Sequence, residues 1–163
     1  MKVCNEMILD IPAKLAELGW TLPQLSKPVA SYVPVVQVGD LLVVSGQLPM
    51  REGKLMATGR VPSGVSVEGA SQAAAQCVVN ALAAIGTHLD GDWSRILQVV
   101  RLGVFVQSDD GFSSQSLVAN GASELLGKLL GPAGQHARVA VGVNALPLGA
   151  CVEVELMVQV ARV

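Results

Sequence analysis

The sequence is poor in aromatic and charged residues, and both shortages limit what the protein can do. Aromatic side chains make up 3% of the 163 residues and charged side chains 15%, and the net charge is −2. Nucleic acid binding relies on basic groups that neutralise phosphates and on rings that stack on bases, so we expect no nucleic acid partner. Hydrophobic residues reach 51%. So few surface charges on so apolar a chain favour contact with another subunit.

Several sequence signals are also missing. No apolar run approaches the ~20 residues that a membrane span needs, and the acidic Glu6 comes too early for a secretory signal. The three cysteines are widely spaced and fit no zinc-binding pattern (Cys4, Cys77 and Cys151). No phosphate-binding loop is present. We therefore expect a cytoplasmic protein with reduced thiols, no metal site, no cofactor and no membrane contact.

Strand patterns occupy the first half of the chain and its middle. Residues 32–38 and 41–46 are predicted to form a hairpin around Gly39-Asp40, and the second of these strands is predicted to be buried on both faces. Glu52-Gly53 indicates a tight turn into a short third strand. The long apolar stretch 96–107 predicts a strand in the interior of the sheet.

Helical periodicity appears in three places. Ser66 is placed to cap a long helix over about 67–87, and Ser113 or Ser114 caps a second that ends near residue 130. A short amphipathic helix is predicted over 10–18. The apolar residues of the second long helix predict its buried side: Leu117, Val118, Gly121, Ala122, Leu125, Leu126 and Leu129.

The segment 134–160 predicts two more strands joined by a Leu-Pro-Leu-Gly turn, and we expect them to pair as a hairpin. Alternation places the valines of 138–145 on one face, toward the helices, and the small and polar residues on the other. The order is therefore strand-strand-strand-helix-strand-helix-strand-strand, with both helices on one face of a mixed α+β sheet. The opposite face, which would carry Ala140, Gly142, Asn144 and Met157, needs a cover, and another copy of the chain is the simplest one.

Arg138 is a charged residue in an apolar stretch of sequence. A guanidinium flanked by Ala137, Val139 and Ala140 needs an anionic partner. That partner is a carboxylate of the protein or of a ligand. In the predicted hairpin, Glu153 would lie roughly 17 Å from Arg138 along the strands, at about 3.3 Å per residue. The two would then meet across a subunit boundary, or Glu153 is a solvated surface residue.

Three groups of motifs, in matching order and spacing, give residues 32–160 a resemblance to a known family. They are Tyr32 followed by Gly39-Asp40 and by Ser45-Gly46-Gln47-Leu48-Pro49; Asn120; and Ala137-Arg138-Val139 followed by Val152-Glu153-Val154-Glu155. This pattern resembles the YjgF/Rid family of reactive intermediate deaminases, also labelled endoribonuclease L-PSP or translation initiation inhibitor. The resemblance implies a chorismate-mutase-like fold over 32–163, after an extension of residues 1–31. It also implies a homotrimer with clefts between its subunits.

The resemblance also implies roles for particular residues. The arginine that matches Arg138 grips the carboxylate of an imine or enamine made from an amino acid, and the acid that matches Glu153 orients the attacking water. Five further positions match residues that line the cleft: Tyr32, Ser45, Gly46, Asn120 and Ala140.

Two positions depart from the family pattern. Ala140 stands where cysteine or threonine is usual, and His136 stands where proline or alanine is usual. His136 either supplies a polar contact beside Arg138 or is a surface residue.

Three functions agree with these observations. The first is a cofactor-free deaminase that hydrolyses 2-imino or enamino acids, or related small carboxylates, to ammonia and a 2-keto acid. The second is a non-catalytic regulatory module that binds a small carboxylate. The third, taken from the family labels, is an endoribonuclease or translation inhibitor, which the charge and aromatic content disfavour.

Overall fold

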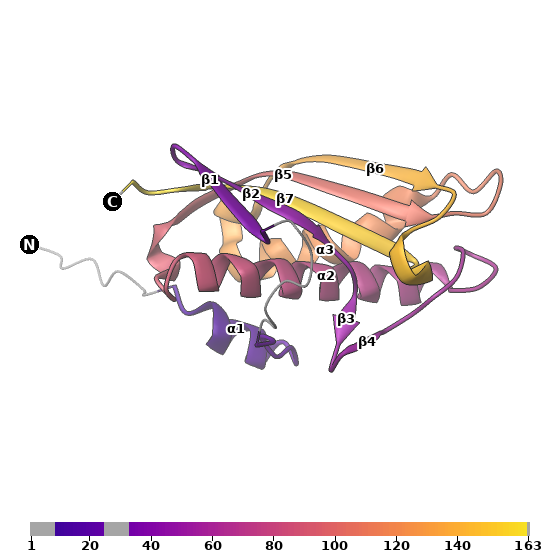
Figure 1. Ribbon diagram of the computed structural model, residues 1–163, viewed down its shortest axis with the longest axis horizontal. Helices are drawn as coiled ribbons and strands as arrows, with labels where there is room; N and C mark the ends of the chain where they lie inside the picture. Colours follow the sequence, from indigo (N-terminus) through magenta and orange to yellow (C-terminus); the bar gives the residue numbers. More distant parts are fainter. Residues whose placement is uncertain (1–8, 25–32, 163) are drawn as a thin grey trace, which may run out of the picture.

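The computed structural model describes residues 9–24 and 33–162, and these form a layered α+β fold (Figure 1). One layer is a sheet of five strands, and two long helices pack against one of its faces. The strands follow one another across the sheet in the order β1 (Val35–Val38), β2 (Leu41–Gln47), β7 (Val152–Val160), β5 (Ile96–Gln107) and β6 (Ala137–Val143). The pairing is antiparallel except between β5 and β6, which run parallel. The predicted mixed sheet with helices on one face is thus confirmed.

The helices begin where the sequence predicts. α1 spans Ile11–Glu17, and Asp10 caps it by accepting a hydrogen bond from the Ala13 amide at 2.9 Å. α2 spans Val67–His88 and begins at Ser66, whose hydroxyl accepts from the Gly69 amide. α3 spans Gln115–Leu130, after Ser114. Three single turns of 3-10 helix complete the list: Trp93–Arg95, Gly131–Gly134 and Pro147–Gly149.

The core lies between the sheet and α2. Residues 73–86 of α2 are all buried, and their small side chains let the helix lie close to its neighbours. The core continues onto α1, whose Ile11 and Leu15 are completely buried and which lies on the outer side of the helix layer (Figure 1). α1, from the predicted extension, therefore packs into the same core as the rest of the chain.

The predicted hairpin of the last two strands is wrong. β5 lies between β6 and β7, parallel to β6 and antiparallel to β7. The loop through Pro147–Gly149 therefore carries the chain over the end of β5 instead of turning tightly. The sequence signal was a turn between two alternating strands, and such a signal does not reveal a third strand inserted between them.

The predicted orientation of β6 is also wrong. Arg138, Ala140 and Gly142 pair with residues of β5 that point toward the helices, so they face α3, and the valines between them face the open side of the sheet. The physical reason is the closeness of α3. A Cβ on Gly142 would lie 2.8 Å from Gln115 Nε2 of α3, so the strand and this helix approach closely at this position.

Three smaller expectations also need correction. β2 is not buried on both faces, because the Val43 side chain is 38% exposed on the open side. Leu117 lies on the outside of α3 at 53% exposure. The short third strand is part of a separate two-stranded ribbon, β3 (Met50–Arg51) with β4 (Lys54–Leu55), joined by the predicted turn at Glu52-Gly53.

Within the part of the chain that is described, no helix combines the length and the apolar character that crossing a membrane requires.

Candidate functional site

Arg138 projects from the edge strand β6 toward α3, where it meets neutral groups. Its Nη1 donates to Asn120 Oδ1 at 3.0 Å and to Ser123 Oγ at 3.0 Å. Asn120 and Ser123 are three residues apart on α3, so one side of that helix presents both oxygens to the guanidinium. The structure thus brings together two of the predicted site residues, Arg138 and Asn120.

His136 extends this group of polar contacts. Its Nε2 lies 3.0 Å from Ser123 Oγ, and its Nδ1 lies 2.6 Å from the Gly134 carbonyl oxygen. Only glycine fits at position 134, because a Cβ there would overlap the Leu126 carbonyl oxygen of α3. The sequence left open whether His136 is a surface residue or a neighbour of Arg138, and the structure places it in the same group.

Arg138, Ser123 and His136 line an open depression of about 330 Å³ at the edge of the sheet. Its walls are Ser123, Gly127, Gly134, Gln135, His136 and Arg138. Among residues 9–24 and 33–162, no carboxylate lies within 4.0 Å of the Arg138 guanidinium, and only its Nη1 donates a hydrogen bond. Arg138 is exposed. The guanidinium therefore presents its positive charge and its remaining N–H donors to this depression.

A second group of predicted residues lies on the open face of the sheet. Glu153 on β7 covers Gly46 on β2, since a Cβ on Gly46 would overlap Glu153 Oε1. Gly103 on β5 makes similar room for Glu155, which also forms an ion pair with Arg101 at 3.8 Å. Both glutamates therefore lie flat over glycines of neighbouring strands.

Glu153 sits in an environment that opposes ionisation. Burial raises the pKa of its carboxyl above the ordinary value of 4.5, and the nearby charge of Glu155 raises it further. A carboxylate with a raised pKa is better able to accept a proton near neutral pH.

Arg138 and Glu153 do not share a site within one chain. Arg138 pairs with Leu102 and faces the helices, whereas Glu153 pairs with Phe105 and faces the open side. The two side chains lie on opposite faces of the sheet and on opposite sides of β5. Their partners on β5, Leu102 and Phe105, are three residues apart. The predicted hairpin of β6 and β7 does not form, yet the predicted separation of Arg138 and Glu153 within one chain is observed.

The remaining predicted site residues have separate places. The Ser45 hydroxyl donates to the Val33 carbonyl oxygen at 2.8 Å, so this donor is already used by the backbone. Ala140 packs partly buried against the core, two residues beyond Arg138 on the same side of β6. Tyr32 lies outside the described residues.

Ser123 is the member of the group that the sequence analysis missed. Its signal was available, since a polar residue three positions after Asn120 lies on the same side of a helix. What the sequence alone does not give is that this side of α3 faces β6.

The cysteines offer no reactive thiol among the described residues. Burial raises the pKa of Cys151 to about 11, and burial with the charges of Cys151 and Glu153 raises that of Cys77 well above 9.0. Both are free and buried. In the same part of the chain, no three His, Cys, Asp or Glu side chains gather closely enough to hold a metal ion.

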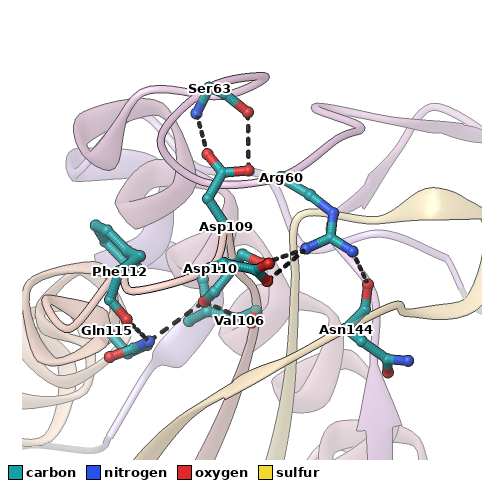
Figure 2. A network of polar contacts seen from close by, with 9 residues as sticks. Arg60, Ser63, Val106, Asp109, Asp110, Phe112, Gln115 and Asn144 are labelled. Atoms are coloured by element: carbon teal, nitrogen blue, oxygen red, sulfur yellow. Dashed lines mark hydrogen bonds and ion pairs between the residues drawn. The ribbon is translucent and has the colours of Figure 1, made fainter.

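A further polar network joins the loops at the far ends of β5 and β6 (Figure 2). Arg60 donates to the Ser108 carbonyl oxygen at 2.7 Å and to the Asn144 carbonyl oxygen at 3.2 Å, with Asp110 at 4.0 Å. Asp109 accepts from both the amide and the hydroxyl of Ser63. Arg60 uses both terminal nitrogens on protein groups, which marks this network as a structural tie between loops.

The mixed sheet with its two helices on one face, and the position of Arg138 on the edge strand, define an α+β protein of the chorismate-mutase-like kind. The family model for Endoribonuclease L-PSP matches residues 24–160. The chain belongs to this family, which is the YjgF/Rid family that its motifs indicate.

Three relatives show how far the similarity extends. A protein of unknown function from Agrobacterium tumefaciens, Atu1372, is 47% identical, with a TM-score of 0.88 over 93% of this chain and 92% of that one. A protein from Shewanella oneidensis MR-1, described as a candidate endoribonuclease, is 29% identical, with a TM-score of 0.86 over 91% of this chain and 98% of that one. Protein TCP17 of Trypanosoma cruzi is 41% identical over 150 residues, covering 91% of this chain and 93% of that protein.

Proposed function

We propose that the protein is a cofactor-free hydrolytic deaminase of 2-imino or enamino acids, releasing ammonia and a 2-keto acid at clefts between the subunits of a homotrimer. The observation that carries this proposal is the state of Arg138. Its guanidinium faces a depression and, among the residues that the structure describes, donates only to the neutral oxygens of Asn120 and Ser123. In the family that the chain belongs to, the matching arginine is expected to hold the substrate carboxylate.

The chemistry of the guanidinium supports a carboxylate ligand. Its planar fork of donors fits a carboxylate through two parallel hydrogen bonds. Asn120 and Ser123 fix one terminal nitrogen without neutralising the charge. This arrangement orients the group while leaving its charge and its other donors for an incoming anion.

The separation of Arg138 from Glu153 supports a cleft between subunits. In one chain these residues occupy opposite faces of the sheet. A neighbouring copy that covers the open face would bring its own surfaces to the edge strand β6. Exposed apolar side chains on that face favour such a contact, among them Val36, Val38, Val43 and Val141.

The test is a coupled assay with the substrate formed in place. An amino-acid oxidase generates the imino acid, and keto-acid release is measured with and without the protein. We expect acceleration by the native protein, none by Arg138→Ala, and native rates for Arg51→Ala, an exposed arginine on β3. Unchanged turnover in Arg138→Ala would remove this arginine from the site.

A non-catalytic module that binds small carboxylates is the second candidate. The observation in its favour is that no acidic side chain described in the same chain lies beside Arg138 to activate water. Saturable binding of a 2-keto acid by calorimetry, without any acceleration of imine hydrolysis, would establish this function and exclude the deaminase.

The label carried by the Shewanella oneidensis relative keeps the endoribonuclease or translation inhibitor role as a third candidate. The net charge of −2 opposes an RNA-binding surface. RNA cleavage that persists through purification and disappears in Arg138→Ala would favour this role.

A further inference from the structure

Hydrolysis of an imine requires a group that takes a proton from the attacking water. The family position assigns this task to Glu153, which lies on the face of the sheet away from Arg138. We propose that in this chain Ser123 is the catalytic residue that contacts the water, and that His136 is the positioning residue that receives the proton through it. This inference rests on the deaminase function proposed above.

When the His136 ring is neutral, the donor and acceptor capacities of the four groups set the direction of each hydrogen bond. The Gly134 carbonyl only accepts, so His136 Nδ1 carries a proton and donates to it. In the neutral ring, Nε2 is then an acceptor, and the Ser123 hydroxyl donates to it. Arg138 only donates, so Ser123 Oγ accepts from its Nη1. The chain of bonds runs from Arg138 to Ser123, to His136 and to Gly134.

This arrangement has the parts of an activated hydroxyl. A serine is bonded to a histidine nitrogen that can take its proton, and a third group orients the ring. Here the third group is a backbone carbonyl. Both side chains line the same depression as Arg138.

The depression that Arg138 and Ser123 share has room for both the carboxylate and the reacting carbon of a 2-imino acid. That carbon is one bond away from the carboxylate carbon. Arg138 Nη1 is occupied by Asn120 and Ser123, so a carboxylate would bind the other donors of the guanidinium, and its imine carbon would lie in the depression that Ser123 also lines. A water molecule between them would contact both the carbon and Ser123 Oγ.

The reaction then proceeds in two steps. The water oxygen bonds to the iminium carbon, the electron pair of the C=N bond moves to nitrogen, and a water proton passes to Ser123 Oγ as the serine proton moves to His136 Nε2. The imidazolium next returns a proton by the same route to the amino nitrogen. The C–N bond breaks, ammonia leaves with the electron pair, and the hydroxyl proton passes to the departing ammonia as the C=O bond of the keto acid forms.

In the part of the chain that the structure describes, the elements around His136 place one charged side chain, that of Arg138, in the depression beside it. Arg138 belongs to β6 and lines the depression, and its guanidinium keeps its charge. On α3, Glu124 and Lys128 line a different groove, between α2 and α3. From β5, Gln98 donates to the Gln135 carbonyl oxygen and carries no charge. Among these residues, His136 is therefore the group able to accept a proton beside Arg138.

The experiment measures kcat, KM and their pH dependence for His136→Gln and Ser123→Ala, with the imino acid supplied by an amino-acid oxidase. Glutamine keeps a hydrogen bond to Ser123 but takes up no proton. We expect kcat to fall about 100-fold in both variants, within the range found for general bases, while KM changes less than about threefold. The dependence of kcat on pH should differ between the native protein and His136→Gln, because glutamine cannot take up a proton.

Matched controls separate this role from a structural one. His88→Gln changes the other histidine, which contacts Gln37, and Ser116→Ala changes an exposed serine of α3. Both should retain native kcat. A raised KM with an unchanged pH profile in His136→Gln would show that the residue only supports Arg138, and would overturn the inference.

Two further outcomes distinguish this inference from the proposed function. If Glu153→Gln abolishes kcat while His136→Gln and Ser123→Ala retain it, Glu153 is the proton acceptor and the inference is wrong, although the deaminase function stands. If the native protein does not accelerate imine hydrolysis at all, the proposed function fails and this inference fails with it.

Discussion

Arg60 and Arg138 differ in how the fold uses their guanidinium groups. Arg60 directs both terminal nitrogens to backbone carbonyls and approaches Asp110, so its donors are used within the fold (Figure 2). Within the described part of the chain, Arg138 donates through Nη1 alone, and its acceptors are neutral side chains. A guanidinium that the fold orients but does not neutralise is suited to bind a carboxylate from solution.

The neutrality of Asn120 is therefore testable by an isosteric change. Asn120→Asp places a carboxylate against Arg138, and this carboxylate competes with any anionic ligand. We expect the Kd of a 2-keto acid to rise at least tenfold, equivalent to about 1.4 kcal/mol, as measured by calorimetry. Asn120→Ala, which removes the hydrogen bond without adding charge, should weaken binding less. Equal effects in the two variants would mean that charge at this position does not matter.

The raised pKa of Glu153 makes stability depend on pH in a defined direction. The folded protein holds this proton more tightly than the unfolded chain does, so the carboxyl contributes less to the free energy of unfolding as pH rises from about 4.5 through its folded pKa. Glu153→Gln removes the cost of ionising this group. We expect the variant to have a higher Tm than the native protein at pH 7 and a similar Tm at pH 4, measured by thermal unfolding.

At the scale of the elements, the contact between α2 and α3 depends on a glycine in the middle of α3. A Cβ on Gly121 would overlap the carbonyl oxygen of Ser71 on α2, which is backbone and cannot turn away. The helix tolerates a residue of low helical propensity because the two helices approach so closely. This close approach places the side of α3 that carries Asn120 and Ser123 against β6.

Two glycines of α3 provide a matched pair for testing this contact. Gly121→Ala should lower the free energy of unfolding by about 1–3 kcal/mol, as overpacking does. Gly127→Ala, which meets nothing within 4 Å, should raise it by up to about 1 kcal/mol through helix propensity. Chemical denaturation followed by circular dichroism measures both. Equal stability of the two variants would contradict the close approach of α2 and α3.

At the scale of the whole molecule, the sheet has one covered face and one open face (Figure 1). The helices cover the first, and apolar side chains remain exposed on the second, with Val38 at 65% and Val141 at 40% exposure. We expect this face to be buried in the proposed homotrimer, because a monomer would leave these valines in water.

Oligomeric state tests this expectation directly. Light scattering should give three times the 16.8 kDa of one chain for the native protein. Val141→Asp, which places a charge on the open face, should shift the mass toward that of one chain. Leu117→Asp, a similar change at an apolar residue exposed on α3, should leave the mass unchanged. A monomeric native protein would remove the cleft between subunits on which the proposed function relies.

The sequence by itself determined the elements and the family. Periodicity and capping residues located the helices, because the 3.6-residue repeat and the bond from Ser66 to Gly69 are local features. The motifs around Ser45 and Arg138 identified the family because each is a short run of consecutive residues, which the sequence shows directly.

Only the tertiary structure decided which strands pair and what each side of a strand faces. Alternation along β6 separates two sets of side chains but does not say which set meets the helices. Here β5 lies between β6 and β7, and α3 lies close to β6, so Arg138 faces α3 instead of the open side. The grouping of Arg138 with Asn120, Ser123 and His136 follows from that packing, because contacts between distant segments depend on how whole elements fit together and not on the order of neighbouring residues.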